Sequence, residues 1–260
     1  MNPPMYVFTT PWWLFLAGLL GLGVVLYAIG RRFGEADTRR RFLLWVALAN
    51  WLLFAAYMIG LATTGRFASY IVWDMPLQLC SLITYGLVIA LATKSRLSQV
   101  LLEFCFYAGS LTGFLALFSP AQGVEGVGVF SPLTFGYFGS HGTNMVISVL
   151  IAAFGLYRPT NRGALRAMGS LLVLAAAIIA LNLAVRALVL PEANYFYLFD
   201  PEGAEILQLL HNAIGLPIVY LVPLLPFALG CFCLQAAMFR GGVRLSRLWG
   251  GDPWHTPAAA

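Results

Sequence analysis

The sequence predicts an all-α membrane protein, a bundle of about seven transmembrane helices, because of its composition and its long apolar runs. Of its 260 residues, 60% are hydrophobic and 10% are charged. Soluble domains average about 45–50% apolar and about 25% charged residues. So few charged side chains cannot cover the surface of a water-soluble globule of this length. The composition therefore excludes a disordered chain, a nucleic-acid-binding module and a secreted disulfide scaffold.

Seven apolar runs are long enough to be spans, because a membrane-crossing helix needs about 20 mostly apolar residues. The segments between them are short and either polar or rich in Gly and Pro, so no second domain is expected. We therefore predict one seven-helix domain over residues 1–240 and a short tail over 241–260. The predicted spans cover residues 12–30, 42–62, 71–92, 98–118, 132–156, 167–190 and 212–239.

The basic residues indicate how these spans are oriented. Cytoplasmic loops carry an excess of Lys and Arg, and 13 of the 15 basic residues fall on one side of an odd number of spans. The remaining two are Arg66 and Arg186. We therefore expect an external N-terminus and a cytoplasmic C-terminus, and the net charge of +5 reports orientation rather than a nucleic-acid partner. The 13 residues are Arg31, Arg32, Arg39, Arg40, Arg41, Lys94, Arg96, Arg158, Arg162, Arg166, Arg240, Arg244 and Arg247.

Polar residues from four of the predicted spans fall at one depth, in the outer half of the bilayer. Cys80 and His141 each lie about nine residues into their spans, or ~13 Å at the helical rise. Polar groups inside a membrane are costly and are treated as functional hypotheses. The same count brings five more side chains to this layer: Gln78, Ser110, Asn144, Asn182 and Arg186.

A cysteine beside a histidine suits nucleophilic acyl transfer, because the imidazole can accept the thiol proton. The amides of Asn144, Asn182 or Gln78 could then stabilise an oxyanion. The natural substrate of such a site is the ester carbonyl of a lipid that enters laterally. A structural interpretation stays open: a buried cysteine behaves as a small hydrophobe, and intramembrane Asn and Ser often join neighbouring helices.

The other reactive side chains are weaker candidates. Cys105, Cys231 and Cys233 are expected to be packing residues. Glu103 is either a proton-handling carboxylate or, as we favour, neutral or hydrogen-bonded. His211 and Asn212 fit either an interfacial cap or the rim of the site, and Asp74 suits the start of a helix.

No cofactor and no metal are predicted. The sequence has no phosphate-binding glycine loop and no helical His-x-x-x-His pair. Its only lysine is Lys94, in a predicted cytoplasmic loop, which excludes a retinal Schiff base in the seventh span.

Three motifs resemble those of a known family. Residues 75–81, Met-Pro-Leu-Gln-Leu-Cys-Ser, are similar to the Leu-Pro-Leu-His-Leu-Cys signature of the YwaF-like bacterial integral membrane proteins, whose eukaryotic relatives form the transmembrane protein 164 family. Ser-His-Gly at 140–142 and Asn-Tyr-Phe-Tyr-Leu at 194–198 also match, and the likeness extends over roughly 40–235.

The resemblance implies a cysteine acyltransferase of ether phospholipids, with Cys80 as nucleophile and His141 as its partner. More distantly, the fold resembles the androgen-induced membrane hydrolases of fatty-acid esters, which place a Thr nucleophile and a His inside a helical bundle. One departure is that Gln78 replaces the signature histidine, and an amide can hydrogen-bond but cannot titrate.

The leading hypothesis is thus a lipid acyltransferase or lipid-ester hydrolase in the bacterial cytoplasmic membrane, with membrane lipids as its partners. The alternative is a non-catalytic membrane subunit that binds a lipid, a pigment or a partner helix through the same polar layer. A transporter or channel is third. A homo-oligomer or a partner in a membrane complex stays open.

Overall fold

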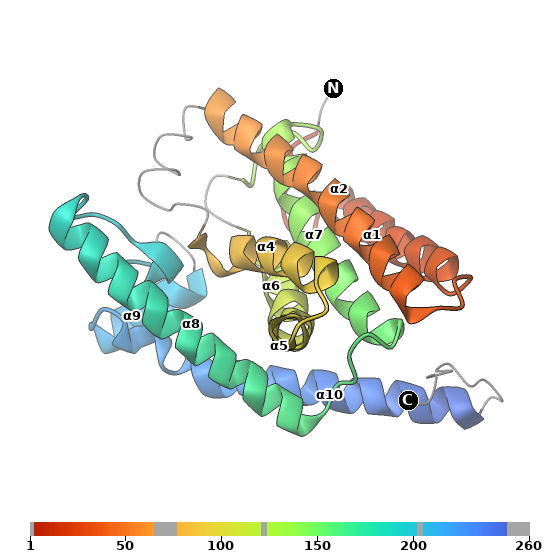
Figure 1. Ribbon diagram of the computed structural model, residues 1–260. Coiled ribbons are helices and arrows are strands. Elements are labelled where there is room, and N and C mark those ends of the chain that lie inside the picture. Colours follow the sequence, from red (N-terminus) through yellow and green to blue (C-terminus); the bar gives the residue numbers. More distant parts are fainter. Residues whose placement is uncertain (1–2, 65–76, 121–123, 202–204, 249–260) are drawn as a thin grey trace.

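A computed structural model describes residues 3–64, 77–120, 124–201 and 205–248, and the side chains of Glu205 and residues 245–248 are not described (Figure 1). Over these residues the regular structure is helical, and one isolated antiparallel bridge joins Pro4 to Gly128. Five helices are long and apolar enough to cross a membrane: Thr10–Gly30, Ala36–Thr63, Arg96–Phe118, Asn161–Leu188 and Val219–Arg244. The prediction of an all-helical membrane protein is confirmed at this level.

The helices α1 (Thr10–Gly30), α2 (Ala36–Thr63) and α7 (Pro132–Ala153) run alongside one another (Figure 1). Small residues allow this close approach, because a Cβ added at Gly136 would collide with the backbone of Tyr57 on α2. Of the 22 residues of α7, 16 are buried. A helix enclosed by its neighbours needs less apolar surface, which explains why α7 tolerates many small and polar residues.

Two further units occupy the middle of the bundle (Figure 1). The described part of the third predicted span is α4 (Leu79–Ala92), which is shorter than the other apolar helices. The fourth predicted span consists of α5 (Arg96–Phe104), the π-helical turn η3 (Cys105–Gly109) and α6 (Ser110–Phe118). A π-turn inserts an extra residue into the helical ladder and often occurs at functional sites.

The sixth and seventh predicted spans lie on the side of the bundle away from α1 (Figure 1). There α8 (Asn161–Leu188) packs against α10 (Leu224–Leu248). The predicted span 212–239 is wrong at its start, because the chain forms the separate helix α9 (Glu205–Ile214) and the 3-10 turn η5 (Val219–Leu221) before α10 begins. Gly215 ends α9 with a φ of 70°, and Pro217 and Pro223 cannot continue a helix.

Polar contacts link the ends of these helices. The ion pair of Asp37 with Lys94 joins the start of α2 to the α4–α5 turn, and Arg40 donates to the carbonyl of Leu91 at 3.0 Å. Arg240 near the end of α10 donates to Asn161 at the start of α8 at 2.9 Å. These contacts lie where the predicted basic loops are.

Candidate active site

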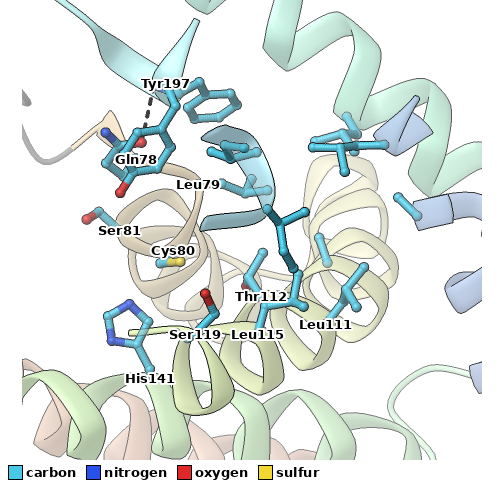
Figure 2. A pocket seen from close by; sticks show the side chains of 18 of the residues that line it. Gln78, Leu79, Cys80, Ser81, Leu111, Thr112, Leu115, Ser119, His141 and Tyr197 are labelled. Atoms are coloured by element: carbon cyan, nitrogen blue, oxygen red, sulfur yellow. Dashed lines mark hydrogen bonds between the residues drawn. The ribbon is translucent and has the colours of Figure 1, made fainter. Parts of the chain in front are cut away.

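A cavity of about 1300 Å³ lies inside the bundle, among α2, α4, α6, α7, α8, α9 and α10. Its lining is predominantly apolar, and its polar side chains come mainly from α4, α6 and α7. Among the described residues that line it there is no Lys, Arg, Asp or Glu. Cys80 and His141, which are 61 positions apart in the sequence, both line this cavity (Figure 2).

Cys80 is held by the first turn of α4, of which it is the second residue. The first hydrogen bond of this helix runs from the Leu82 amide to the Gln78 carbonyl, at 3.1 Å. The N–H groups of the first turn therefore have no partner within the helix. The side chain of Thr112 on α6 is in hydrogen-bonding contact with the Cys80 sulfur. A negative charge that develops beside Cys80 would meet the positive end of the helix dipole.

His141 lies in the middle of α7 with its imidazole fixed by the preceding turn. Its Nδ1 is 2.7 Å from the carbonyl oxygen of Tyr137, and the Tyr137 ring lies 4.3 Å away between centroids. Since a carbonyl oxygen only accepts, Nδ1 is the donor, and Nε2 of the neutral ring is the acceptor. This tautomer leaves a basic nitrogen available on a side chain that lines the cavity.

Cys80 and His141 are not joined directly: among the described residues no hydrogen bond connects the two side chains. Both point into the cavity (Figure 2). Catalytic hydrogen bonds are often long or absent without substrate and form in the reacting complex. Proton transfer between the two side chains therefore requires a rotamer change or a bridging group.

The amides of Gln78 and Asn144 also line the cavity, but both already have partners. Gln78 Oε1 accepts a hydrogen bond from the Phe196 amide at 3.2 Å. The Asn144 amide accepts from Asn50 and donates to Thr84, each at 2.8 Å. Gln78 thus joins the start of α4 to the segment at Phe196, and Asn144 joins α2 to α4.

Ser110, Asn182 and Arg186 are not among the residues that line the cavity. Ser110 donates to the Phe106 carbonyl of its own helix. Asn182 binds both the N–H and the C=O of Tyr195, at 3.0 and 2.8 Å. Arg186 donates to the Ala193 carbonyl at 2.8 Å. Asn182 and Arg186 thus act on the cavity only through the segment 193–198, whose residues Phe196, Tyr197 and Leu198 line it.

Several residues at or beside the cavity could not be identified from their predicted depth in the membrane alone. Thr84 and Tyr137 lie one turn from Cys80 and His141 and could have been identified by that spacing. Thr112 and Ser119 also line the cavity, but nothing in the sequence distinguishes them from other helical hydroxyls. Asn50 does not line the cavity but binds Asn144, which does. It is an amide in the second predicted span, so it carries the same sequence signal as Asn144, a polar group inside a membrane.

The remaining candidates have structural surroundings. Glu103 accepts hydrogen bonds from Tyr157 and Arg166, in agreement with the hydrogen-bonded interpretation. Cys105 is fully buried in the main core. His211 stacks edge-on against Tyr220 at 5.1 Å. Arg66, Asp74, Met75, Pro76 and residues 249–260 of the predicted tail lie outside the described residues, whereas residues 241–248 continue α10.

No metal centre was expected, and within the described ranges no group of three or more His, Cys, Asp or Glu side chains could hold a metal ion. The titratable side chains of the described cavity lining are those of one cysteine, one histidine and tyrosines.

The apolar helices define a class, the multi-pass membrane proteins. The sequence pattern of the TMEM164 family matches residues 7–235, which is most of the chain. The chain therefore belongs to the TMEM164 family. No curated protein and no solved structure matches it.

Proposed function

We propose that the protein is a membrane-embedded enzyme that transfers or hydrolyses a fatty acyl group of a lipid, with Cys80 as nucleophile and His141 as general base. The observation that carries the proposal is that Cys80 and His141 line one mostly apolar cavity. The free Nε2 of His141 supports its role as a base. The position of Cys80 in the first turn of α4 supports stabilisation of an oxyanion by backbone N–H groups.

The reaction would proceed through a thioester. Cys80 Sγ forms a bond to the ester carbonyl carbon while the thiol proton passes to His141 Nε2. The ester C–O bond then breaks, and the leaving lipid alcohol takes the proton from His141. A second alcohol or water next gives its proton to His141 and attacks the thioester carbon. The C–S bond breaks, and the sulfur recovers the proton.

The character of the cavity supports a lipid as substrate. Its wall between α6, α8 and α10 is lined by aliphatic and aromatic side chains, among them Leu171, Leu225 and Phe232. A ligand pocket usually has about 300–1,000 Å³, so 1300 Å³ accommodates a long chain together with its ester. The described lining holds no charged partner for a phosphate, so the portion of the lipid inside the cavity is uncharged.

The arrangement in the membrane is part of the proposal. We infer that α1, α2, α4, the α5–η3–α6 unit, α7, α8 and α10 all cross, with the N-terminus outside. The contacts of Asp37 with Lys94 and of Arg240 with Asn161 support this, because they gather segments rich in basic residues. We further place the chain with the YwaF-like bacterial proteins, in the cytoplasmic membrane, because of its 75–81 motif.

The test is acyl transfer by purified protein in lipid nanodiscs that contain a lipid ester with a labelled acyl chain. Cys80→Ala and His141→Ala should each lower the rate at least about a hundredfold, since each removes a group needed for bond making. Cys231→Ala and His211→Ala are matched controls that remove the same residue types away from the proposed pair, and both should retain activity. Activity that survives both Cys80→Ala and His141→Ala would refute the proposal.

A second candidate is a non-catalytic lipid-binding subunit, which the missing hydrogen bond between Cys80 and His141 favours. Lipid would then co-purify with the protein and would leave without chemical change. In that case, the protein would bind the labelled lipid and return it intact, and Cys80→Ala would leave binding unaltered.

A further inference from the structure

A chain of buried polar side chains crosses three helices and ends at the proposed nucleophile. Asn50 on α2 donates from Nδ2 to Asn144 Oδ1 on α7 at 2.8 Å. Asn144 Nδ2 donates to Thr84 Oγ1 on α4 at 2.8 Å. Thr84 Oγ1 is 3.2 Å from the backbone carbonyl oxygen of Cys80. Asn50, Asn144 and Thr84 are all less than 5% exposed.

The direction of the chain follows from its last member. The Cys80 carbonyl can only accept, so the Thr84 hydroxyl donates to it and its oxygen accepts from Asn144. The Asn144 Nδ2 group must then face α4, which turns Oδ1 toward α2 and requires Asn50 to be a donor. Asn50 Nδ2 also reaches the Ser140 carbonyl at 3.4 Å. No other arrangement of these amides satisfies every link.

The chain connects the two turns that carry the proposed chemistry. Asn144 lies three residues after His141, and Thr84 lies four residues after Cys80, so each shares a helix face with its partner. Asn50 lies in the contact of α2 with α7, where its Nδ2 reaches both Asn144 and the Ser140 carbonyl. The turn that holds the base is therefore firmly seated on α2, and the turn that holds the nucleophile is attached to it through Thr84.

We propose that Asn50 is a positioning residue, which acts through Asn144 and Thr84 to hold the Cys80 turn of α4 in register with the His141 turn of α7. The inference rests on the proposed function of Cys80 and His141. Asn50 is not among the residues that line the cavity, so its effect on the reaction must pass through the chain. A small displacement of a nucleophile from its base is costly, because catalysis depends on the distance between the reacting atoms.

The experiment compares Asn50→Leu, Thr84→Val and Thr84→Ser in full-length protein in nanodiscs. Valine has nearly the shape of threonine but neither accepts from Asn144 nor donates to Cys80, whereas serine keeps the hydroxyl. Thr134→Val is the matched control, because Thr134 is a fully buried threonine of α7 outside both the chain and the cavity lining. Two quantities are measured: kcat and KM for acyl transfer, and the alkylation rate of each cysteine by a lipophilic maleimide, read by mass spectrometry.

Asn50→Leu and Thr84→Val should each lower kcat about tenfold or more, because the reacting groups lose their alignment. KM should stay within about twofold, because Asn50 lies outside the cavity lining and valine keeps nearly the shape of Thr84 in the cavity wall. The alkylation rate of Cys80 relative to Cys231 should fall in the same two variants. Thr84→Ser should recover most of both quantities, and Thr134→Val should resemble the unmodified protein.

Two results would overturn the positioning role. One is that Thr84→Ser is as impaired as Thr84→Val. The other is that Thr84→Val and Asn50→Leu are no more impaired than Thr134→Val. Alkylation separates this failure from failure of the proposed function. If the unmodified protein transfers no acyl group, yet Cys80 alkylation falls in Thr84→Val and Asn50→Leu and recovers in Thr84→Ser, the positioning stands and the enzymatic proposal falls.

Discussion

Buried polar residues of this protein have two distinct roles, which their partners distinguish. His141 uses one ring nitrogen for a structural bond and keeps the other available. Glu103, in contrast, has both carboxylate oxygens engaged, by Arg166 and by Tyr157. A group whose hydrogen-bonding capacity is spent on neighbours contributes to stability, whereas a group with capacity left at a cavity can act on a ligand. This distinction assigns Glu103 to the framework and supports the proposed role of His141.

For Glu103 we expect a stability effect without a direct effect on chemistry. Glu103→Gln keeps the shape but removes the charge that Arg166 faces, and hydrogen bonds to charged groups contribute about 1.5–3 kcal/mol. The variant should therefore unfold at a lower temperature in detergent. Lys94→Gln is the control, because it breaks the exposed ion pair with Asp37, and such pairs are typically worth about 0–1 kcal/mol. Equal unfolding temperatures for the two variants would contradict this assignment.

At the level of elements, the contact of α2 with α7 organises the bundle. Three glycines on α7 approach neighbouring helices: Gly136 meets the Tyr57 backbone, Gly139 meets Leu53 and Gly142 meets Leu19 of α1. In a membrane the lipid is as apolar as the side chains, so helices associate through close packing and hydrogen bonds rather than through hydrophobic burial. The same α2–α7 interface buries Asn50 beside Asn144. Packing of this interface therefore determines where His141 lies.

Gly136→Ala should weaken this interface. The new methyl group would collide with backbone atoms of Tyr57, which cannot move as a flexible side chain would. Overpacking of this kind typically costs about 1–3 kcal/mol. Gly18→Ala on α1 is the matched control, since a Cβ there meets nothing within 4 Å and alanine favours a helix. The unfolding temperature should fall for Gly136→Ala alone. An equal fall in both variants would contradict the importance of close packing at the α2–α7 interface.

At the level of the whole molecule, the basic residues and the hydrogen bonds between segments distinguish two ends of the bundle. Basic residues concentrate near the α1–α2, α4–α5 and α7–α8 connections and the end of α10. The segments near the opposite ends of α4 and α8 join through hydrogen bonds of Gln78 with Phe196 and of Asn182 with Tyr195. The cavity extends to this second group, since Phe196 and α9 line it. In the proposed topology this end faces outside, so the proposed lipid substrate would enter from the outer leaflet.

Reporter fusions test this topology. A reporter that is active only in the cytoplasm should be active when fused after residue 248 and inactive when inserted in the loop over residues 189–194. The expectation follows from the retention of Lys and Arg on the cytoplasmic side. Moving both reporters into a variant that lacks Arg31 and Arg32 checks that charge determines the result. Activity from both fusion sites in the unmodified protein would contradict a membrane crossing by α10 between them.

The sequence by itself determined the all-helical, membrane-spanning character of the protein, whereas the number of spans and the common depth of Cys80 and His141 stay predictions. These properties depend on hydropathy and on helical rise, which add up along the chain. The sequence-based prediction was wrong where a helix is interrupted locally. The span expected over 212–239 is interrupted because Gly215 adopts a positive φ and two prolines follow it.

Only the tertiary structure decided which partner each polar side chain takes. Asn144 and Asn182 look alike in sequence, yet Asn144 links α2 to α4 beside the cavity, whereas Asn182 holds the backbone of Tyr195 outside it. Depth is set by position along one helix. Contact also depends on how each helix is rotated and how closely its small residues let a neighbour approach, and these depend on all the helices together.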